Sequence, residues 1–279
     1  MKLTAKYRFG FIGTGKMAQA ILGSMLRAKL AKPNEVLVSD PSAQTLRAAA
    51  QRFRVATTSD NLEVARRCEW IWLGTKPFHA AEVLQEISPL LRKKQVLLSM
   101  MAGVSTRSLR AWAGRGPALV RIMPNTPALL GAGATGVFFA KPCPRPVQRQ
   151  VEKILRAMGV FVALPKEDLL DGVTGLSGSG PAFIYLVAQG LIEGGERAGL
   201  KPAQAKTLAV QTLLGAARML AESGHAPEEL ILHVATKGGT TEAGLATLEA
   251  RGLRAALAEA VAAATRRAAE IREQNECTR

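Results

Sequence analysis

A glycine-rich turn between an apolar strand and an amphipathic helix constrains the fold of this chain most strongly. Residues 7–12 are largely apolar and predict a buried strand, and Gly-Thr-Gly-Lys-Met-Ala follows at positions 13–18. In this G-x-G-x-x-A pattern Gly13 permits a tight turn, Gly15 lets the backbone approach a pyrophosphate, and Ala18 allows close packing of helix on strand. A purely structural turn is the alternative. The position between a first strand and a first helix favours a dinucleotide site.

Further apolar segments predict a doubly wound parallel sheet of the Rossmann type in the first half of the chain. They lie at residues 35–39, 70–73, 96–101, 119–122, 135–139 and 160–164. In an open parallel sheet, ligands bind at the carboxyl ends of the strands. After Lys166 the pattern changes to long helices without strand signals. We therefore expect an α/β domain at residues 1–165 and an all-helical domain for substrate binding and dimerisation at residues 166–279.

The second predicted strand is followed by Asp40, an acidic residue at the position that binds the adenosine ribose in NAD enzymes. A carboxylate there would repel a ribose 2′-phosphate, whereas nearby Ser42 and Arg47 offer a donor and a cation for one. An alternative is that Asp40 and Pro41 form a turn in which Asp40 caps the next helix. Both interpretations leave the choice between NADH and NADPH open.

Two segments of glycines and hydroxyl residues in the second half predict a small-ligand site. Residues 174–183 read Thr-Gly-Leu-Ser-Gly-Ser-Gly-Pro-Ala-Phe, which predicts a tight loop leading into a helix capped by Ser177 or Ser179. Unpaired backbone N–H groups there would face a small anion such as a carboxylate. An ordinary capped helix is the alternative. Residues 235–244 have the same character and, in the same domain, predict a second ligand-binding loop.

The helices themselves predict self-association. Gly190, Gly194 and Gly195 are poor helix formers and indicate close approach to another helix. The segment 253–273 has a single apolar stripe on a basic helix. Because about a hundred residues of one-sided helices cannot bury all these faces alone, we expect at least a homodimer.

Composition excludes several other classes of protein. A formal net charge of +15 would suit a nucleic-acid binder, but the basic residues are scattered and aromatic residues make up only 5% of the chain. We therefore expect no nucleic-acid partner. The three cysteines lack metal-ligand spacing, which predicts reduced thiols and no metal. No apolar run resembles a signal peptide or a membrane span, so we expect no membrane partner and a cytoplasmic location.

Taken together, these segments resemble the pyrroline-5-carboxylate reductase family. The resemblance rests on residues 13–18, 76–77, 123–127, 171–183 and 237–241. The last two motifs are highly specific to the family. The resemblance implies an N-terminal Rossmann domain that binds NADPH or NADH, and a helical domain that forms an interlocked dimer, often within larger rings. It also implies reduction of Δ1-pyrroline-5-carboxylate to L-proline, the last step of proline biosynthesis.

The resemblance also implies site residues. Those for the cofactor are Ile12, Gly13, Thr14, Gly15, Lys16, Met17, Ser39, Asp40, Ser42, Asn61, Gly74, Thr75, Lys76, Pro77, Met100, Met101 and Ala102. Those for the substrate are Glu167, Ser177, Gly178, Ser179, Gly180, Thr236, Gly238, Gly239, Thr240 and Thr241. The chain departs from the family at Asp40, where relatives that use NADPH often carry a small polar residue, and at Lys237, where many have proline. The first departure leaves the NADPH preference open.

The chemistry of imine reduction agrees with these residue types. It needs a hydride, a bound carboxylate and a proton on nitrogen, but no strong base, so orientation and proximity are the main contributions. We expect the Thr241 hydroxyl to bond the ring nitrogen as the catalytic group; a helix N-cap is its alternative role. One other function is a 3-hydroxy acid dehydrogenase, for which Lys206 is the candidate acid or base. A non-catalytic dinucleotide-sensing relative is another.

Overall fold

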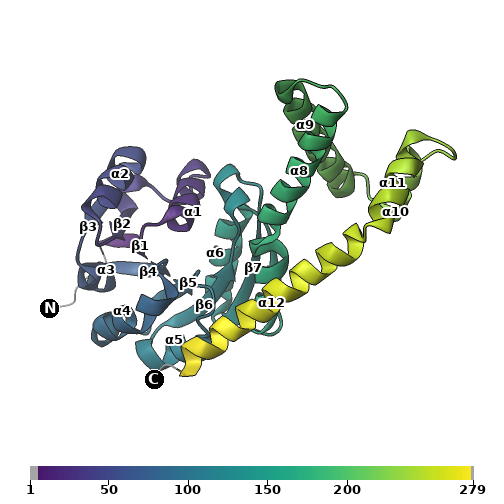
Figure 1. The fold of residues 1–279 in the computed structure, drawn as a ribbon. Helices are drawn as coiled ribbons and strands as arrows, with labels where there is room; N and C mark the ends of the chain where they lie inside the picture. The colour runs from purple at the N-terminus through teal and green to yellow at the C-terminus, as the bar shows by residue number, and fades with distance from the viewer. Residues whose placement is uncertain (1–5, 278–279) are drawn as a thin grey trace. The chain divides into compact units, whose positions relative to one another are not determined.

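The computed structural model describes residues 6–277, and its larger unit is built on one eight-stranded sheet (Figure 1). The strand order is β3-β2-β1-β4-β5-β6-β7-β8, and every neighbouring pair is parallel except β6 and β7. The strands are β1 (Tyr7–Ile12), β2 (Val36–Ser39), β3 (Ala56–Thr58), β4 (Cys68–Leu73), β5 (Val96–Ser99), β6 (Ala118–Met123), β7 (Gly133–Ala140) and β8 (Gly159–Ala163). The predicted doubly wound α/β sheet is confirmed.

Helices cover both faces of this sheet (Figure 1). One face packs against α1 (Lys16–Arg27), α2 (Ala43–Phe53) and α6 (Arg145–Arg156), and the other against α3 (Asn61–Arg67), α4 (Ala80–Ile87) and α5 (Thr106–Ala113). Short 3-10 helices occur at Pro33–Glu35, Pro77–His79, Ser88–Leu90 and Thr126–Leu130. In the first layer the ring of Phe11 stacks on its strand partner Trp72 at a centroid distance of 5.7 Å. Burial on both faces explains why the central strands are almost continuously apolar.

The described residues divide into two compact units, one of residues 6–179 with 262–277 and one of residues 180–261. This division differs from the predicted boundary after residue 165. The segment after Pro165 stays with the sheet because α7 (Leu169–Val173) packs on β7: a Cβ added to Gly136 would lie 2.8 Å from Val173 Cγ2. Prediction from local pattern recognised the change to helices but not which unit they pack against.

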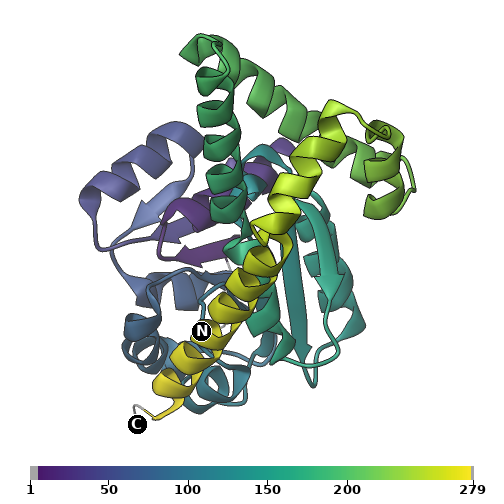
Figure 2. The same cartoon turned by 45° about the vertical axis from the view of Figure 1, so that its right-hand side comes forward.

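The last turns of α12 (Leu253–Cys277) also belong to the sheet unit, and both views show them beside it (Figures 1 and 2). Arg272 Nε donates to Asp171 Oδ2 at 2.9 Å, and Asn275 Nδ2 donates to the Gly103 carbonyl at 2.9 Å. Gly103 has φ +69°, and a Cβ there would lie 2.5 Å from Ile271 Cγ2. The turn after β5 is therefore held by the C-terminal end of the chain.

The second unit is entirely helical. It comprises α8 (Gly180–Arg197), α9 (Pro202–Glu222), α10 (Pro227–Val234), α11 (Thr240–Ala250) and the first turns of α12. A Cβ added to Gly195 would lie 3.1 Å from the Cβ of Ala205 on α9, which confirms the predicted close approach of another helix at Gly195. A Cβ added to Gly190 or Gly194 would meet no atom within 4 Å. Large apolar side chains stay exposed, among them Leu186 at 69% and Val234 at 66%. This unit has more apolar surface than it buries by itself.

A buried ion pair fixes the segment that leads into α7. Arg121, on β6, is 4% exposed, and its Nη1 donates to Glu167 Oε1 at 2.7 Å. The same oxygen accepts the Thr106 backbone N–H at 2.6 Å, and the other oxygen accepts the Thr106 hydroxyl. The carboxylate of Glu167 thus joins β6, the start of α5 and the entry to α7. Glu167 accepts three hydrogen bonds in all, two of them from Thr106.

Replacing Glu167 by Gln should destabilise the sheet unit. The change removes the negative partner of the buried Arg121 guanidinium, which costs about 3 kcal/mol. Urea unfolding followed by tryptophan fluorescence measures this, since Trp70, Trp72 and Trp112 all lie in the sheet unit. Glu228→Gln is the matched control, because it removes the charge of an exposed carboxylate in the helical unit. A loss below about 1 kcal/mol for Glu167→Gln would show that the pair contributes little.

Candidate functional site

The carboxyl ends of β1, β2, β4 and β5 are joined by backbone hydrogen bonds. The Gly13 N–H donates to the Ser39 carbonyl at 2.9 Å, and the Gly74 N–H donates to the Ile12 carbonyl at 2.8 Å. The Met100 N–H donates to the Leu73 carbonyl at 3.1 Å. The turns that sequence reasoning assigned to the cofactor therefore lie side by side at one edge of the sheet. In a doubly wound sheet this edge is the place where ligands bind.

The two glycines of the first turn, Gly13 and Gly15, have different structural roles. Gly13 has φ +84°, and a Cβ there would lie 2.7 Å from the Gly74 carbonyl carbon, so a side chain is excluded by conformation and by space. Gly15 has an ordinary φ of −68° and stands at the N-cap of α1, where no side chain caps the helix. A Cβ added to Gly15 would meet no atom within 4 Å. The open backbone at a helix N-terminus fits a pyrophosphate.

Asp40 bridges the glycine turn and the turn after β2. Its Oδ2 accepts the Thr14 backbone N–H at 2.9 Å, and its Oδ1 accepts the Ser42 backbone N–H at 3.0 Å. The cap of α2 is Ser42, whose hydroxyl accepts the Thr45 N–H at 3.2 Å. The alternative in which Asp40 caps that helix is therefore wrong. Arg47, on the first turns of α2, is exposed and has no ion pair within the described part of the chain.

Other predicted cofactor residues gather at the same edge. Asn61 begins α3, and its Oδ1 accepts the Ser39 hydroxyl at 2.8 Å. The Thr75 hydroxyl donates to Met101 Sδ at 3.3 Å, which links the turns after β4 and β5. Lys76 is exposed at the N-cap of the 3-10 helix that starts at Pro77. The remaining positions lie within these turns or on the first turn of α1, namely Lys16, Met17 and Ala102.

The segment predicted as a tight loop at residues 174–183 is helical. After α7, residues Thr174–Gly178 form one π-helical turn, and α8 begins at Gly180. The Ser179 N–H donates to the Thr174 carbonyl at 2.8 Å, and the Ser177 hydroxyl donates to the Val173 carbonyl at 3.1 Å. Ser179 ends the π-helical turn as its C-cap, and neither serine side chain caps the start of α8, so the expectation of a loop leading into a serine-capped helix is wrong. Single π-helical turns inside helices are frequent at functional sites.

Sequence reasoning did not assign a role to Asn125, which holds the π-helical turn in place. Its Nδ2 donates to the Ser177 carbonyl at 3.0 Å, and its Oδ1 accepts the Ala134 N–H at 2.9 Å. A Cβ on Gly178 would lie 2.9 Å from Met123 Cε, so the turn packs on the end of β6. One feature of the sequence could have indicated this role: Asn125 is a polar residue that closely follows the buried strand β6. Glu167, predicted at the substrate, faces Arg121 and Thr106 instead; its substrate contact stays a prediction.

In the helical unit, the turn at residues 236–239 leads into α11. The Gly239 N–H donates to the Thr236 carbonyl at 2.9 Å, and the Gly238 N–H donates to Glu242 Oε2 at 2.5 Å. The N-cap of α11 is Gly239, so the alternative role of Thr241 as that cap is wrong. Thr241 lines an apolar groove of about 440 Å³ between α9, α10 and α11. Its hydroxyl is the group of α11 that sequence reasoning expected at the ligand.

The groups gathered here are of kinds that suit binding and orienting a ligand rather than strong acid or base chemistry. The sheet edge offers backbone N–H groups and hydroxyls for a dinucleotide, and the helix starts offer small polar residues for a second ligand. Within residues 6–277 no group of three or more His, Cys, Asp and Glu side chains is arranged to hold a metal ion. Over the same residues, no helix is both long and apolar enough to cross a bilayer.

Two family models match the chain. The model described as pyrroline-5-carboxylate reductase dimerisation covers residues 167–271. The model described as NADP oxidoreductase coenzyme F420-dependent covers residues 8–103. The first spans the helical unit and the π-helical turn, and the second spans the glycine turn and the strand ends beside it.

Similar proteins extend over nearly the whole chain. A pyrroline-5-carboxylate reductase of Pseudomonas aeruginosa is 37% identical over 96% of this chain and 97% of its own length. Pyrroline-5-carboxylate reductase 3 of Xenopus laevis is 40% identical over 94% of this chain and 95% of its own. The structure of the Coxiella burnetii enzyme matches with a TM-score of 0.88, 35% identity, and coverage of 95% and 98%. The chain belongs to the pyrroline-5-carboxylate reductase family.

Proposed function

We propose that this protein reduces Δ1-pyrroline-5-carboxylate to L-proline with NADPH or NADH. The observation that carries the proposal is the open backbone at Gly15, beside the strand ends joined by Gly13 and Gly74, in a chain of this family. The substrate is the one in the names of the relatives. The alternatives of a 3-hydroxy acid dehydrogenase acting through Lys206 and of a non-catalytic sensor find no comparable support.

Bound NADPH or NADH supplies the hydride for the imine carbon. The π-electron pair of the C=N bond then resides on nitrogen, and the nitrogen holds one added proton, which the protonated pyrrolinium form of the substrate brings with it or water supplies. The backbone at Gly15 and the N-terminus of α1 bind the pyrophosphate. Residues 177–180 and 236–240 are proposed to hold the substrate carboxylate and ring. The Thr241 hydroxyl donates a hydrogen bond to the ring nitrogen. Binding in a reactive orientation supplies most of the acceleration.

We propose a preference for NADPH. The Asp40 carboxylate already accepts two backbone N–H groups, from Thr14 and Ser42, which hold it within the turn. The exposed Arg47 guanidinium and the Ser42 hydroxyl are the groups proposed for a ribose 2′-phosphate. In support, a pyrroline carboxylate reductase of Plasmodium falciparum, 29% identical with a TM-score of 0.86, was solved with NADP bound.

A homodimer or larger homo-oligomer is the proposed working form. The exposed apolar side chains of α8 and α9, such as Leu186 and Leu208, need a covering surface of matching chemistry. A second copy supplies one, and the family model that matches residues 167–271 is a dimerisation model. We further propose a cytoplasmic location, in which the thiols stay reduced.

Turnover of NADPH with pyrroline-5-carboxylate tests the proposal directly. We expect loss of nicotinamide absorbance only when the substrate is present, proline as the product, and a higher kcat/KM with NADPH than with NADH. Enzymes of ordinary efficiency reach kcat/KM of roughly 10⁴ M⁻¹s⁻¹ or more. A folded protein that binds NADPH and forms no proline with either cofactor would contradict the proposed reaction. A preference for NADH would contradict only the assignment of Ser42 and Arg47.

Thr241→Ala should lower kcat at least roughly tenfold while leaving the NADPH dissociation constant unchanged. The change removes one hydroxyl hydrogen bond to the reacting nitrogen, a contact that strengthens as charge develops there. Thr247→Ala on the same helix is the control, because its exposed hydroxyl donates to the Ala243 carbonyl. Equal kcat values for Thr241→Ala and Thr247→Ala would remove Thr241 from the mechanism.

A further inference from the structure

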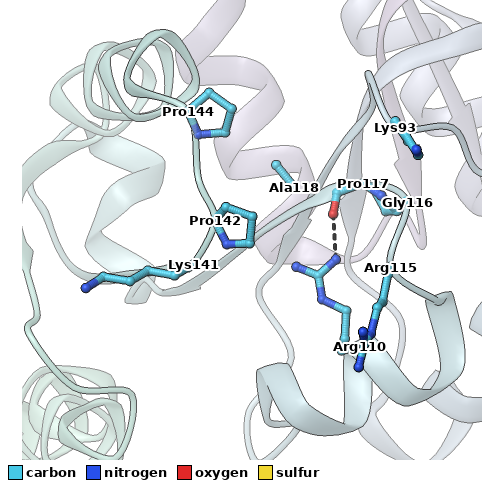
Figure 3. A pocket seen from close by; sticks show the side chains of 9 residues that line it. All are labelled: Lys93, Arg110, Arg115, Gly116, Pro117, Ala118, Lys141, Pro142 and Pro144. Carbon is cyan, nitrogen blue, oxygen red and sulfur yellow. Dashed lines mark hydrogen bonds between the residues drawn. The ribbon is translucent and has the colours of Figure 1, made fainter.

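A second cavity lies at the opposite edge of the sheet from the strand ends described above. It has a volume of about 570 Å³ and is formed where β5 and β6 begin and the antiparallel β7 ends (Figure 3). Its walls are Lys93, Arg110, Arg115, Gly116, Pro117, Ala118, Lys141, Pro142 and Pro144. The predicted cofactor and substrate residues are absent from this lining. The cavity is therefore separate from the proposed active site and needs its own explanation.

The charged groups of this cavity are all cations. Four of the nine lining residues are Lys or Arg and none is Asp or Glu. Within the described part of the chain, none of the four cations forms an ion pair with a carboxylate. In Figure 3 Arg110 and Arg115 lie together below Pro117, Lys93 lies on the other side of Gly116, and Lys141 extends away from them. Arg110 and Arg115 therefore form a pair of neighbouring cations, and Lys93 is a further lining cation beyond Gly116.

The sequence around the cavity explains why these charges stay uncompensated. No Asp or Glu occurs between Glu86 and Glu152. That interval contains ten basic residues: Arg92, Lys93, Lys94, Arg107, Arg110, Arg115, Arg121, Lys141, Arg145 and Arg149. Arg121 pairs with Glu167 from outside the interval, but the cations of the cavity have no such partner within residues 6–277. A run of this length without acidic residues concentrates positive charge on one part of the sheet unit.

Among the four cations of the cavity, Arg110 is the one that a hydrogen bond holds within the described residues. Its Nη1 donates to the Pro117 carbonyl at 2.8 Å, so its guanidinium is held at the wall, and its other N–H groups have no partner within the described residues. Partial burial, together with the charge of Arg115, lowers the pKa of Arg110. Arg115 thus lies near the half-buried Arg110, and no carboxylate pairs with either of them within the described residues. An anion placed between them would relieve this repulsion.

We propose that this cavity binds a small polyanion of the phosphate class. The planar guanidinium groups of Arg110 and Arg115 match the paired oxygens of a phosphate group, and Lys93 adds a mobile point charge for a second group. The volume lies within the range of small-molecule sites and exceeds the need of a single phosphate. The walls formed by Pro117, Pro142 and Pro144 give the non-phosphate part of such a ligand an apolar surface.

Titration calorimetry with inorganic tripolyphosphate tests the proposal on the full-length protein. The variant carries Lys93→Gln and Arg115→Gln, two exposed residues whose loss breaks no hydrogen bond within residues 6–277. Lys94→Gln with Arg149→Gln is the matched control, since it removes two exposed cations from the same acid-free interval outside the cavity. We expect wild type and control to bind alike and the cavity variant to bind about 100-fold more weakly, roughly tenfold for each cation.

The cofactor site also attracts phosphates, so each variant is titrated with NADPH as well. An unchanged NADPH dissociation constant in the cavity variant shows that its loss of tripolyphosphate binding is local. If the cavity and control variants weaken tripolyphosphate binding equally, the proposal is overturned, because the net charge of the protein then accounts for the binding. No tripolyphosphate binding by the wild type would also overturn it. Citrate binding as tight as tripolyphosphate would contradict the phosphate class. Each outcome is independent of whether the protein reduces pyrroline-5-carboxylate.

Discussion

The close approach of two backbone turns at Gly13 and Gly74 determines how the sheet unit presents a ligand. A Cβ on Gly13 would lie 2.7 Å from the Gly74 carbonyl carbon, and one on Gly74 would lie 3.0 Å from the Gly13 carbonyl oxygen. Because neither residue has a side chain, the ends of β1 and β4 meet directly. Asp40 then reaches Thr14 from the next strand end. The floor of the proposed cofactor site is thus backbone, with its donors fixed before a ligand arrives.

Local patterns predicted the sheet well because both of its faces are buried and its strands are therefore apolar runs. They failed where tertiary contacts decide the conformation. β3 was missed because Ala56–Thr58 is a short edge strand without an apolar run. Residues 174–178 looked like a loop because glycine and serine punctuate loops, yet Asn125 and Met123, some fifty residues away, hold them as a π-helical turn.

The same dependence on distant contacts explains which site residues could be predicted from the sequence. The glycine turn could be predicted from the sequence because phosphate binding requires glycines at this spacing. The pairing of Glu167 with Arg121 joins residues 46 apart in sequence, so no local pattern distinguishes it from an exposed carboxylate at a substrate. The contact of the last turns of α12 with the sheet unit likewise joins distant residues, because Arg272 binds Asp171 from 101 residues away. Family resemblance predicted the motifs, whereas the contacts that orient them come from the fold.

The NADPH dissociation constant of a Gly15→Val variant tests the central claim, a preformed dinucleotide site at the carboxyl edge of the sheet, most directly. The backbone at Gly15 accepts any residue, and the space beside it is open, so the thermal midpoint of unfolding should not change. The valine side chain would occupy the space assigned to the pyrophosphate. We predict a dissociation constant at least roughly tenfold higher than that of the wild type. An unchanged constant in a folded variant would contradict this placement of the cofactor.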